Sequence, residues 1–381
     1  MVEWKKLGEV CDIFDGTHQT PKYTDNGIKF VSVENINCLY ESNKYISEDD
    51  YNSNYKTKPR KNDVLMTRIG DVGSCAIIDK DEPLAYYVSL ALLRPNSDLV
   101  LSGYVKYVLE SHTGKRELRK RTLLTAVPLK INLGDVGKVC IPLPTMSEQN
   151  RIVGILDTFT SSIENLKQQI ADRRKQLEHY RDQLLDLEGK KGVEIKTLGE
   201  FCDTLSGFPF DSTQFSEAGI RLMRGMNIKR GYFDFSEDNN KYWNSSEGLE
   251  KYLLEANDII ISMDGSLVGR SFCYLRKEHL PLLLVQRVAR IRTKDNYKYV
   301  YYNIAKRFPD YVDKKKTAGA IPHISMKDIN GFIIPLPSKE EQSRIVSILD
   351  TFEASIANLE AQLSQREKQY EYYRNKLLTF E

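Results

Sequence analysis

The stretch IPLPTMSEQNRIVGILDTF, residues 141–159, shows how this chain is organised, because it occurs twice. Residues 334–352 read IPLPSKEEQSRIVSILDTF. The wider alignment of residues 141–188 with 334–381 keeps an offset of 193 without a gap, and 28 of its 48 positions are identical. Such similarity cannot arise by chance, so the chain contains an internal duplication.

Both copies predict a long helix with a coiled-coil seam. Apolar residues recur at alternating steps of four and three, the spacing of heptads. Prolines before each copy must lie outside the helix, and Ser147 and Ser338 are candidate N-caps. Arg173 and Arg366 occupy seam positions, either as register devices or as snorkelling side chains. The seam comprises Ile152, Leu156, Phe159, Ile163 and Leu166 in the first helix and Ile345, Leu349, Phe352, Ile356 and Leu359 in the second.

Connectivity predicts that the two helices pair antiparallel. The first helix enters the second globular segment and the second helix leaves it, so these two helix ends lie at the same domain. About 36 residues at about 1.5 Å per residue give a spacer of roughly 54 Å.

The globular segments between the helices repeat more weakly and predict a mixed, strand-rich α/β fold. LGEVCD at 7–12 matches LGEFCD at 198–203, and Glu34-Asn35-Ile36 matches Met226-Asn227-Ile228. Short β-branched runs predict strands over residues 29–33, 63–67, 75–78, 88–93, 258–262 and 285–291. Helices are expected over 102–110 and 297–306. The chain thus divides into a first globular domain (1–144), a helix (145–188), a linker (189–195), a second globular domain (196–337) and a second helix (338–381).

Composition and charge narrow the class of protein. The 381 residues contain no apolar run near the roughly 18 residues that span a bilayer. The N-terminus has no signal-peptide core, which points to the cytoplasm. The six scattered cysteines predict free thiols. Each helix has six basic and eight acidic residues, so the net charge of +2 leaves about +6 for the globular domains.

Motifs of the expected enzyme classes are missing. The chain has no (Asn/Asp)-Pro-Pro-(Tyr/Phe) loop of an adenine methyltransferase and no Walker phosphate loop. Asp310 and Asp313 resemble part of a metal-nuclease motif, but they are too close in sequence to lie on two separate strands. None of the five histidines belongs to an evident triad or metal site. The sequence therefore predicts neither a catalytic site nor a metal site.

Basic residues interleaved with aromatic and amide residues are candidates for contacting DNA. Lys and Arg neutralise phosphates, and Arg or Asn can pair with base edges. Any single charge is more often an ordinary solvated residue than a DNA contact. Further basic residues cluster at 115–121 and at 314–316. The candidates are Lys58, Arg60, Lys61 and Arg68 in the first domain, and Arg224, Asn227, Lys229, Arg230, Trp243, Arg270, Arg287 and His323 in the second.

The whole chain resembles the specificity subunits of type I restriction–modification systems. The resemblance rests on the two helix starts, on the opening WKKLGEV at 4–10 and on DGTHQTPKY at 15–23. The second half adds SGFPF at 206–210 and GAIPHIS at 319–325. The first half has AVPLK at 126–130 instead, in which His323 has no counterpart.

The resemblance implies two target-recognition domains that each read one half of a bipartite, asymmetric site in double-stranded DNA. The helices would set the spacing and dock two modification subunits, which methylate adenine at N6. Restriction subunits would join for cleavage. S-adenosylmethionine, ATP and Mg would be bound by these partner subunits, and no cofactor by this chain. Alternatives are a stand-alone methyltransferase or nuclease, disfavoured by the missing motifs, and a scaffold that binds no DNA, disfavoured by the charge of the globular domains.

Overall fold

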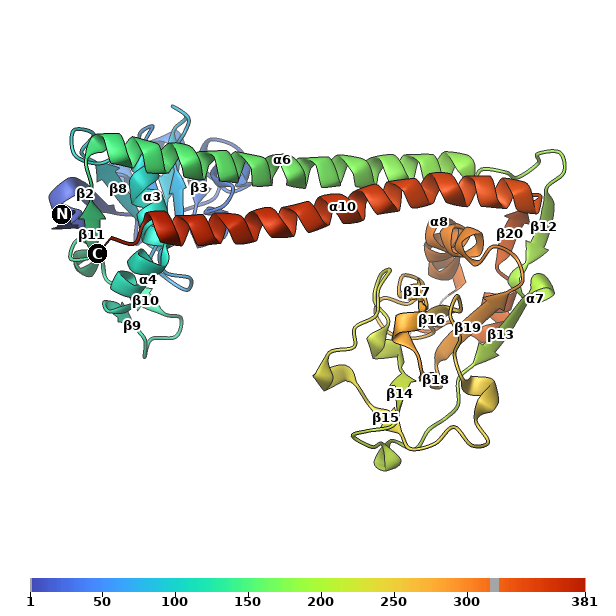
Figure 1. Ribbon diagram of the computed structural model, residues 1–381. Coiled ribbons are helices and arrows are strands. Elements are labelled where there is room, and N and C mark those ends of the chain that lie inside the picture. Colours follow the sequence, from blue (N-terminus) through green and yellow to red (C-terminus); the bar gives the residue numbers. More distant parts are fainter. Residues whose placement is uncertain (1, 316–321, 381) are drawn as a thin grey trace. The chain divides into compact units, whose positions relative to one another are not determined.

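The computed structural model describes residues 2–315 and 322–380, which form two compact units (Figure 1). Unit 1 comprises Met1–Gln168 and Glu360–Glu381, and unit 2 comprises Gln169–Leu359. Each unit contains one globular domain and a stretch of both long helices. The sequence-based boundaries treat the helices as separate segments, whereas the compact units share them, because each helix adds side chains to both hydrophobic cores.

Unit 1 is built on a four-stranded antiparallel sheet. Its order is β2 (Cys11–Asp15), β8 (Leu90–Pro95), β5 (Val64–Thr67) and β6 (Cys75–Ile77). A three-stranded sheet follows the order β4 (Tyr45–Ile46), β3 (Ile28–Val31) and β7 (Leu84–Tyr86), with β3 parallel to β7. Two short pairs complete it, β1 (Glu3–Lys6) with β11 (Cys140–Leu143) and β9 (Thr122–Leu123) with β10 (Lys130–Ile131).

The four-stranded sheet of unit 1 is buried on both faces, since alternate residues of a strand point to opposite sides. Val64 and Met66 pack with the helices, whereas Leu65 packs against the three-stranded sheet. These three side chains are 0% exposed. Full burial of such a side chain contributes roughly 1.5–3 kcal/mol to stability. The short helices are α1 (Leu7–Val10), α2 (Glu48–Asn54), α3 (Ser102–Glu110), α4 (His112–Arg119) and α5 (Leu133–Val136).

Unit 2 repeats this architecture. Its four-stranded sheet has the order β13 (Cys202–Ser206), β19 (Val288–Thr293), β16 (Ile259–Ser262) and β17 (Phe272–Tyr274). Its three-stranded sheet has the order β15 (Tyr242–Trp243), β14 (Ile220–Met223) and β18 (Leu282–Leu284), and β12 (Glu194–Thr197) pairs with β20 (Ile333–Leu336). The helices are α7 (Leu198–Phe201), α8 (Tyr297–Lys315) and α9 (Met326–Asn330).

The predicted strands are confirmed, with ends that differ by up to three residues, and both predicted short helices are present. The prediction for 102–110 matches α3, whereas α8 continues to Lys315, well beyond residue 306. In unit 1 the corresponding helix is interrupted at Ser111, whose hydroxyl caps α4 by accepting the N–H of Gly114 at 3.2 Å. Residues 319–321 of the GAIPHIS motif and Lys316 lie outside the described residues.

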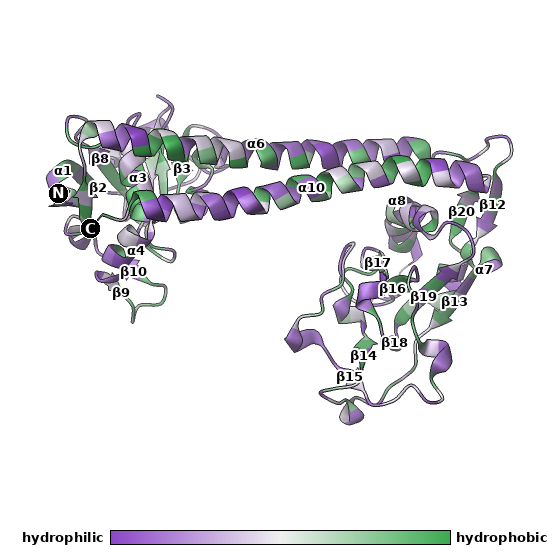
Figure 2. Ribbon diagram, in the orientation of Figure 1, coloured by the Kyte–Doolittle hydropathy of each residue, from purple (hydrophilic) through white to green (hydrophobic). Residues whose placement is uncertain are grey.

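The long helices are α6 (Met146–Leu184) and α10 (Lys339–Leu377), and their seam positions are the buried or half-buried ones. In unit 1, Ile152 and Leu156 of α6 join the core that contains Leu378. In unit 2, Ile345 and Leu349 of α10 join the core that contains Leu185. The helices are antiparallel within each unit. Figure 2 shows isolated apolar residues along both helices and denser apolar colouring on the strands.

Both helices differ from the prediction at their ends. Ser338 caps α10, since its Oγ accepts the N–H of Glu341 at 3.3 Å. The prediction that Ser147 caps α6 was wrong, because the hydroxyl of Thr145 accepts the corresponding N–H, that of Glu148, at 3.3 Å. Helix α6 stops at Leu184 although the prediction extended to 188. The chain then buries Leu185 and Leu187, and residues two apart cannot both face one side of a helix.

Candidate nucleic-acid interface

Three strand ends of unit 1 meet at one edge of its four-stranded sheet. Strands β2 and β5 end there, at Asp15 and Thr67, and β8 begins there, because β8 is antiparallel to both. Backbone hydrogen bonds join the segments beyond these ends. Val88 N–H donates to the Thr17 carbonyl (3.0 Å), Arg68 N–H to Ser89 (2.8 Å) and Ile131 N–H to Arg68 (2.9 Å). We call residues 16–19, 68–70, 86–89 and 129–131 the first strand-end row.

Unit 2 has the same row at the same sheet edge. Gln286 N–H donates to the Phe208 carbonyl (2.8 Å), Met263 N–H to Arg287 (2.9 Å) and Ile324 N–H to Met263 (2.9 Å). Residues 207–208, 263–265, 284–287 and 322–324 form this second strand-end row. The backbone bonds repeat between the units although most of the side chains differ.

A glycine opens each row because the backbone of the neighbouring segment is too close for a side chain. A Cβ on Gly16 would lie 2.4 Å from the carbonyl carbon of Tyr87. A Cβ on Gly207 would lie 2.1 Å from the carbonyl oxygen of Val285. Both glycines belong to motifs that the sequence marked, and the contact explains why these motifs contain glycine.

His323 has a structural counterpart in the first half, contrary to the prediction. Lys130 forms an isolated bridge with Ile69, and His323 forms the equivalent bridge with Asp264. Both side chains are exposed. Sequence comparison missed the match because Pro322 directly precedes His323, whereas one additional residue separates Pro128 from Lys130.

The structure brings Arg287 and His323 of unit 2 together at Asp264, with the backbone that follows Arg224 nearby. Arg287 is 67% exposed and lies 3.5 Å from the Asp264 carboxylate. His323 pairs with Asp264 through the backbone bridge. Arg224 directly follows β14. Because β14 is parallel to β18, it ends where β18 ends, beside residues 284–287 of the second strand-end row. The next residue, Gly225, lies close enough that a Cβ on it would be 3.5 Å from Asp264 Oδ1.

Arg68, which the sequence predicts to contact DNA, belongs to the first row but is buried beside Asp15. It is 7% exposed and lies 3.2 Å from Asp15 Oδ1. Burial lowers the pKa of the Arg68 guanidinium, and the charge of Asp15 opposes that shift. Asp15 also pairs with His18 Nε2 at 2.9 Å. A surface cavity of about 500 Å³ opens beside this group, lined by residues 14–19 and 54–57.

Two predicted residues of unit 2 have structural roles. Asn227 is fully buried: its Oδ1 accepts the N–H of Arg224 at 3.1 Å, and its Nδ2 donates to the Asp234 carbonyl at 2.9 Å. It therefore shapes the loop after β14 and cannot reach a ligand. Trp243 is half-buried with its ring 4.9 Å from that of Phe210.

The remaining predicted residues of unit 2 lie outside the second row. Lys229 is 3.7 Å from Asp234. Arg230 is exposed beside β17, with a backbone bridge to Phe272. Arg270 forms a bidentate pair with Asp313, at 2.6 and 3.1 Å, which raises the pKa of the guanidinium. The structure therefore does not gather these three residues into one site.

Lys58, Arg60 and Lys61 are exposed, but they precede β5 and so lie at the opposite end of the sheet from the first row. Lys58 Nζ lies 4.7 Å from the ring centroid of Tyr51. The three residues line a surface cavity of about 430 Å³ with Lys80 and the acidic residues 81 and 82. The structure thus separates this loop from Arg68.

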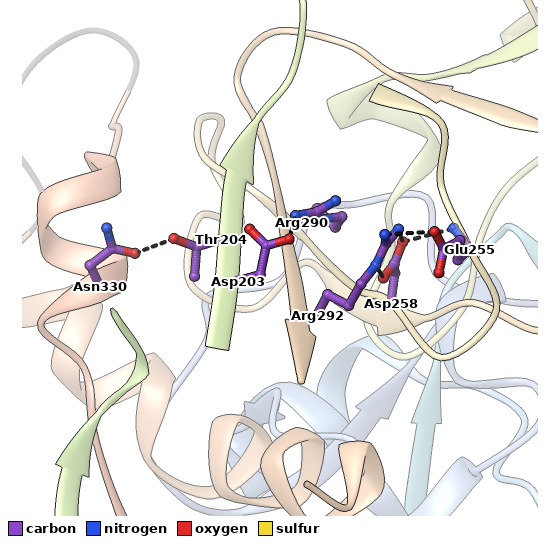
Figure 3. Close-up of polar contacts among 7 residues, drawn as sticks. All are labelled: Asp203, Thr204, Glu255, Asp258, Arg290, Arg292 and Asn330. Carbon is purple, nitrogen blue, oxygen red and sulfur yellow. Dashed lines mark hydrogen bonds and ion pairs between the residues drawn. The ribbon is translucent and has the colours of Figure 1, made fainter. Parts of the chain in front are cut away.

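The corresponding end of unit 2 holds a network of matched charges (Figure 3). Arg292 makes a bidentate pair with buried Asp258, at 2.6 and 2.7 Å, and also bonds Glu255 at 2.7 Å. The hydrogen bond to Asp258 raises the pKa of Arg292. Arg94 and Asp63 form the equivalent pair in unit 1, at 2.7 and 2.9 Å. These two arginines hold the sheet together and are already neutralised by their carboxylate partners, so they offer little free charge to an anion.

Comparison with known proteins identifies the family. The model of the type I restriction modification DNA specificity domain matches residues 1–172 and again 190–367. The chain belongs to this family. The specificity subunit of the Escherichia coli restriction enzyme EcoR124I/EcoR124II is 35% identical over 261 residues, which are 64% of this chain and 63% of that subunit. The EcoAI specificity subunit of E. coli is 31% identical over 47% of this chain and 31% of its own length. The matches thus span less than two thirds of either relative.

A solved structure shows the same fold across the whole chain. The S subunit of the type I restriction–modification system from M. genitalium superposes with a TM-score of 0.61 and 16% identity, covering 100% of this chain and 97% of that one. Among the described residues of this chain, no helix has both the length and the hydropathy of a membrane span, and no His, Cys, Asp or Glu cluster could hold a metal ion. The six cysteines are free, as predicted.

Proposed function

We propose that each strand-end row reads one half of a bipartite site in double-stranded DNA. The single observation that carries this proposal is the repetition of one backbone framework with different side chains. Lys130 corresponds to His323, Ile69 to Asp264, and the buried Asp15–Arg68 pair to the contact between Ser206 Oγ and Met263 Sδ at 4.0 Å. Two readers with one frame and unlike surfaces would recognise two unlike half-sites.

The chemistry of the second row suits recognition of DNA. The guanidinium of Arg287 can pair with a base edge or a phosphate, and the exposed His323 can hydrogen-bond to either. At the equivalent position of the first row, Lys130 can neutralise a phosphate. Asp264 beside Arg287 limits the orientations of the guanidinium and can accept a hydrogen bond from a cytosine amino group. The row forms at the ends of a buried sheet, a rigid support from which loops can enter a groove.

The rest of the function follows from the family. We propose that α6 and α10 set the distance between the half-sites and dock two modification subunits, and that restriction subunits join for cleavage. The chain itself would be non-catalytic and act in the cytoplasm. S-adenosylmethionine, ATP and Mg would be bound by the partner subunits.

The test is selection of DNA from a pool of randomised duplexes by the full chain in complex with its modification subunits. We expect the recovered duplexes to share two short conserved blocks separated by a gap of fixed length and no fixed sequence. Omitting this chain should abolish the enrichment. Recovery of one contiguous block, or of no common sequence, would contradict the proposal.

A further inference from the structure

An exposed apolar hairpin extends from unit 1 beside α4 (Figure 1). We call residues 122–131, which comprise β9, β10 and the loop between them, the apolar hairpin. Its loop has no charged residue. Val127 is 99% exposed and Leu124 is 53% exposed. So much exposed apolar surface at one tip indicates a binding surface.

The base of the hairpin is held firmly. Ile131 is 2% exposed, and its N–H donates to the Arg68 carbonyl at 2.9 Å. Gly70 N–H donates to the Leu129 carbonyl at 2.8 Å, and the Thr122 hydroxyl donates to the Leu118 carbonyl at 2.9 Å. Two of these bonds are part of the first strand-end row. The tip therefore extends from the same rigid edge to which we assign DNA reading.

Positive charge surrounds the base of the hairpin. Residues 112–131 contain six basic residues and one acidic residue, Glu117, a net charge of +5 without His112. Glu117 pairs with Lys120 and Arg121. Burial raises the pKa of Glu117, but the bonds and charges of these two partners outweigh it and keep that pKa below its usual value. We define the basic flank as the exposed residues that form no ion pair within the described part of the chain, namely Lys115, Arg116, Arg119 and Lys130.

We propose that the apolar hairpin is a wedge that inserts between base pairs of duplex DNA, with the basic flank held on the adjacent phosphates. This inference rests on the proposed function and specifies how unit 1 engages its half-site. Apolar side chains that enter a groove unstack a base step and bend the duplex by about 20–90°. The exposed tip gains burial on binding, and the flank supplies the attraction to phosphate. The net charge of +5 over residues 112–131 favours a polyanion such as DNA as the occupant.

The test uses the full chain in complex with its modification subunits and a duplex that the wild-type complex selects from the randomised pool. Energy transfer between dyes at the two duplex ends reports the bend, and a gel shift reports the affinity. We expect the double variant Leu124→Ser/Val127→Ser to straighten the duplex and to lose at least about tenfold in affinity, with an unchanged dependence on salt. Val127→Ile should retain both properties, as should Leu99→Ser, which replaces a leucine of 42% exposure outside the hairpin.

Variants of the basic flank should behave differently. Arg116→Ala and Arg119→Ala should each reduce the salt slope by about one unit while the bend persists. A serine double variant that bends and binds DNA like the wild type overturns the wedge, and so does one that instead loses only its modification subunits. If the wild-type complex selects no duplex, the proposed function itself fails, and this inference fails with it.

Discussion

The guanidinium of Arg366 lies over the ring of Phe159, 5.7 Å from its centroid, and Arg173 lies at the same distance from Phe352. The two pairs are related by the offset of 193, one in each unit. Sequence alone left these arginines as register devices or snorkelling side chains. Each covers an aromatic ring of the other helix, so it contributes to the pairing and still exposes its charge.

This contact predicts a coupling between Arg173 and Phe352. A double-mutant cycle with Arg173→Ala and Phe352→Ala, followed by urea unfolding of the full chain, should give a coupling free energy of about 0.5–1 kcal/mol. The same cycle with Lys175, an exposed residue on the same helix, should give none. Additive effects of the Arg173 and Phe352 substitutions would show that the guanidinium–ring contact contributes nothing.

The buried carboxyl of Glu110 should make the stability of the folded chain depend on pH. Its Oε1 accepts the N–H of Cys75 at 3.0 Å, and burial raises the pKa of the carboxyl. The folded state therefore holds the proton more strongly than the unfolded state. Stability should fall as the pH rises from the usual carboxyl pKa of about 4.3 through the raised value. Glu110→Gln keeps the acceptor oxygen, so its Tm should exceed that of the wild type at about pH 7 and match it below about pH 4.

Glu148 is the matched control for this experiment. Its hydrogen bonds to Arg151 lower the pKa of its carboxyl. A lowered folded pKa favours the folded state at neutral pH, and this effect disappears as the pH falls through that value. Glu148→Gln should thus shift Tm at neutral pH in the opposite direction. A Glu110→Gln variant that is less stable than the wild type at all pH values would contradict the assignment.

Replacing Gly16, the glycine of the first row, should reduce the stability of the fold. Gly16→Ala places a Cβ 2.4 Å from backbone atoms of Tyr87, so the row must move apart, at a cost of about 1–3 kcal/mol. Gly154→Ala, within α6 and with open space around it, should instead stabilise by up to about 1 kcal/mol. Thermal unfolding of both variants checks the pair. Equal effects would mean that the close approach does not constrain residue 16.

We expect Arg287 to contribute to DNA affinity, because it is an exposed cation of the second strand-end row. Arg287→Ala should weaken binding to the selected duplex by about 1–3 kcal/mol if the guanidinium reads a base, with relaxed preference at one position. Arg276 is a suitable control, because it is 62% exposed but follows β17 at the opposite end of the sheet. Arg276→Ala should bind like the wild type. Equal losses in the two variants would place the reading surface elsewhere.

The repeat, the heptad seam and most strands could be predicted from the sequence because their signals are local and periodic. Alternation of four and three residues identifies a seam without knowledge of the partner. The roles of individual polar residues could not be predicted in this way. Arg68 is buried because Asp15, 53 positions earlier, pairs with it, and Asn227 is buried because its amide closes a loop onto Asp234. Such partners are set by the tertiary structure.

The equivalence of Lys130 and His323 was hidden for a different reason. One additional residue after Pro128 shifts the alignment, and only the hydrogen bonds to Arg68 and Met263 restore the match. The sequence did identify the motifs around Gly16 and Gly207. It did not show that these motifs, together with residues 68 and 287, meet at one sheet edge.

Sequencing of N6-methyladenine tests most directly whether the two strand-end rows read separate half-sites. The measurement compares a host expressing the wild-type chain with its modification subunits against hosts expressing Lys130→Ala or Arg287→Ala. The wild type should methylate one bipartite motif. Lys130→Ala should alter recognition of the first half-site alone. Arg287→Ala should relax the base preference of the second half-site alone. A contiguous motif, or two variants that alter the same half, would contradict the claim.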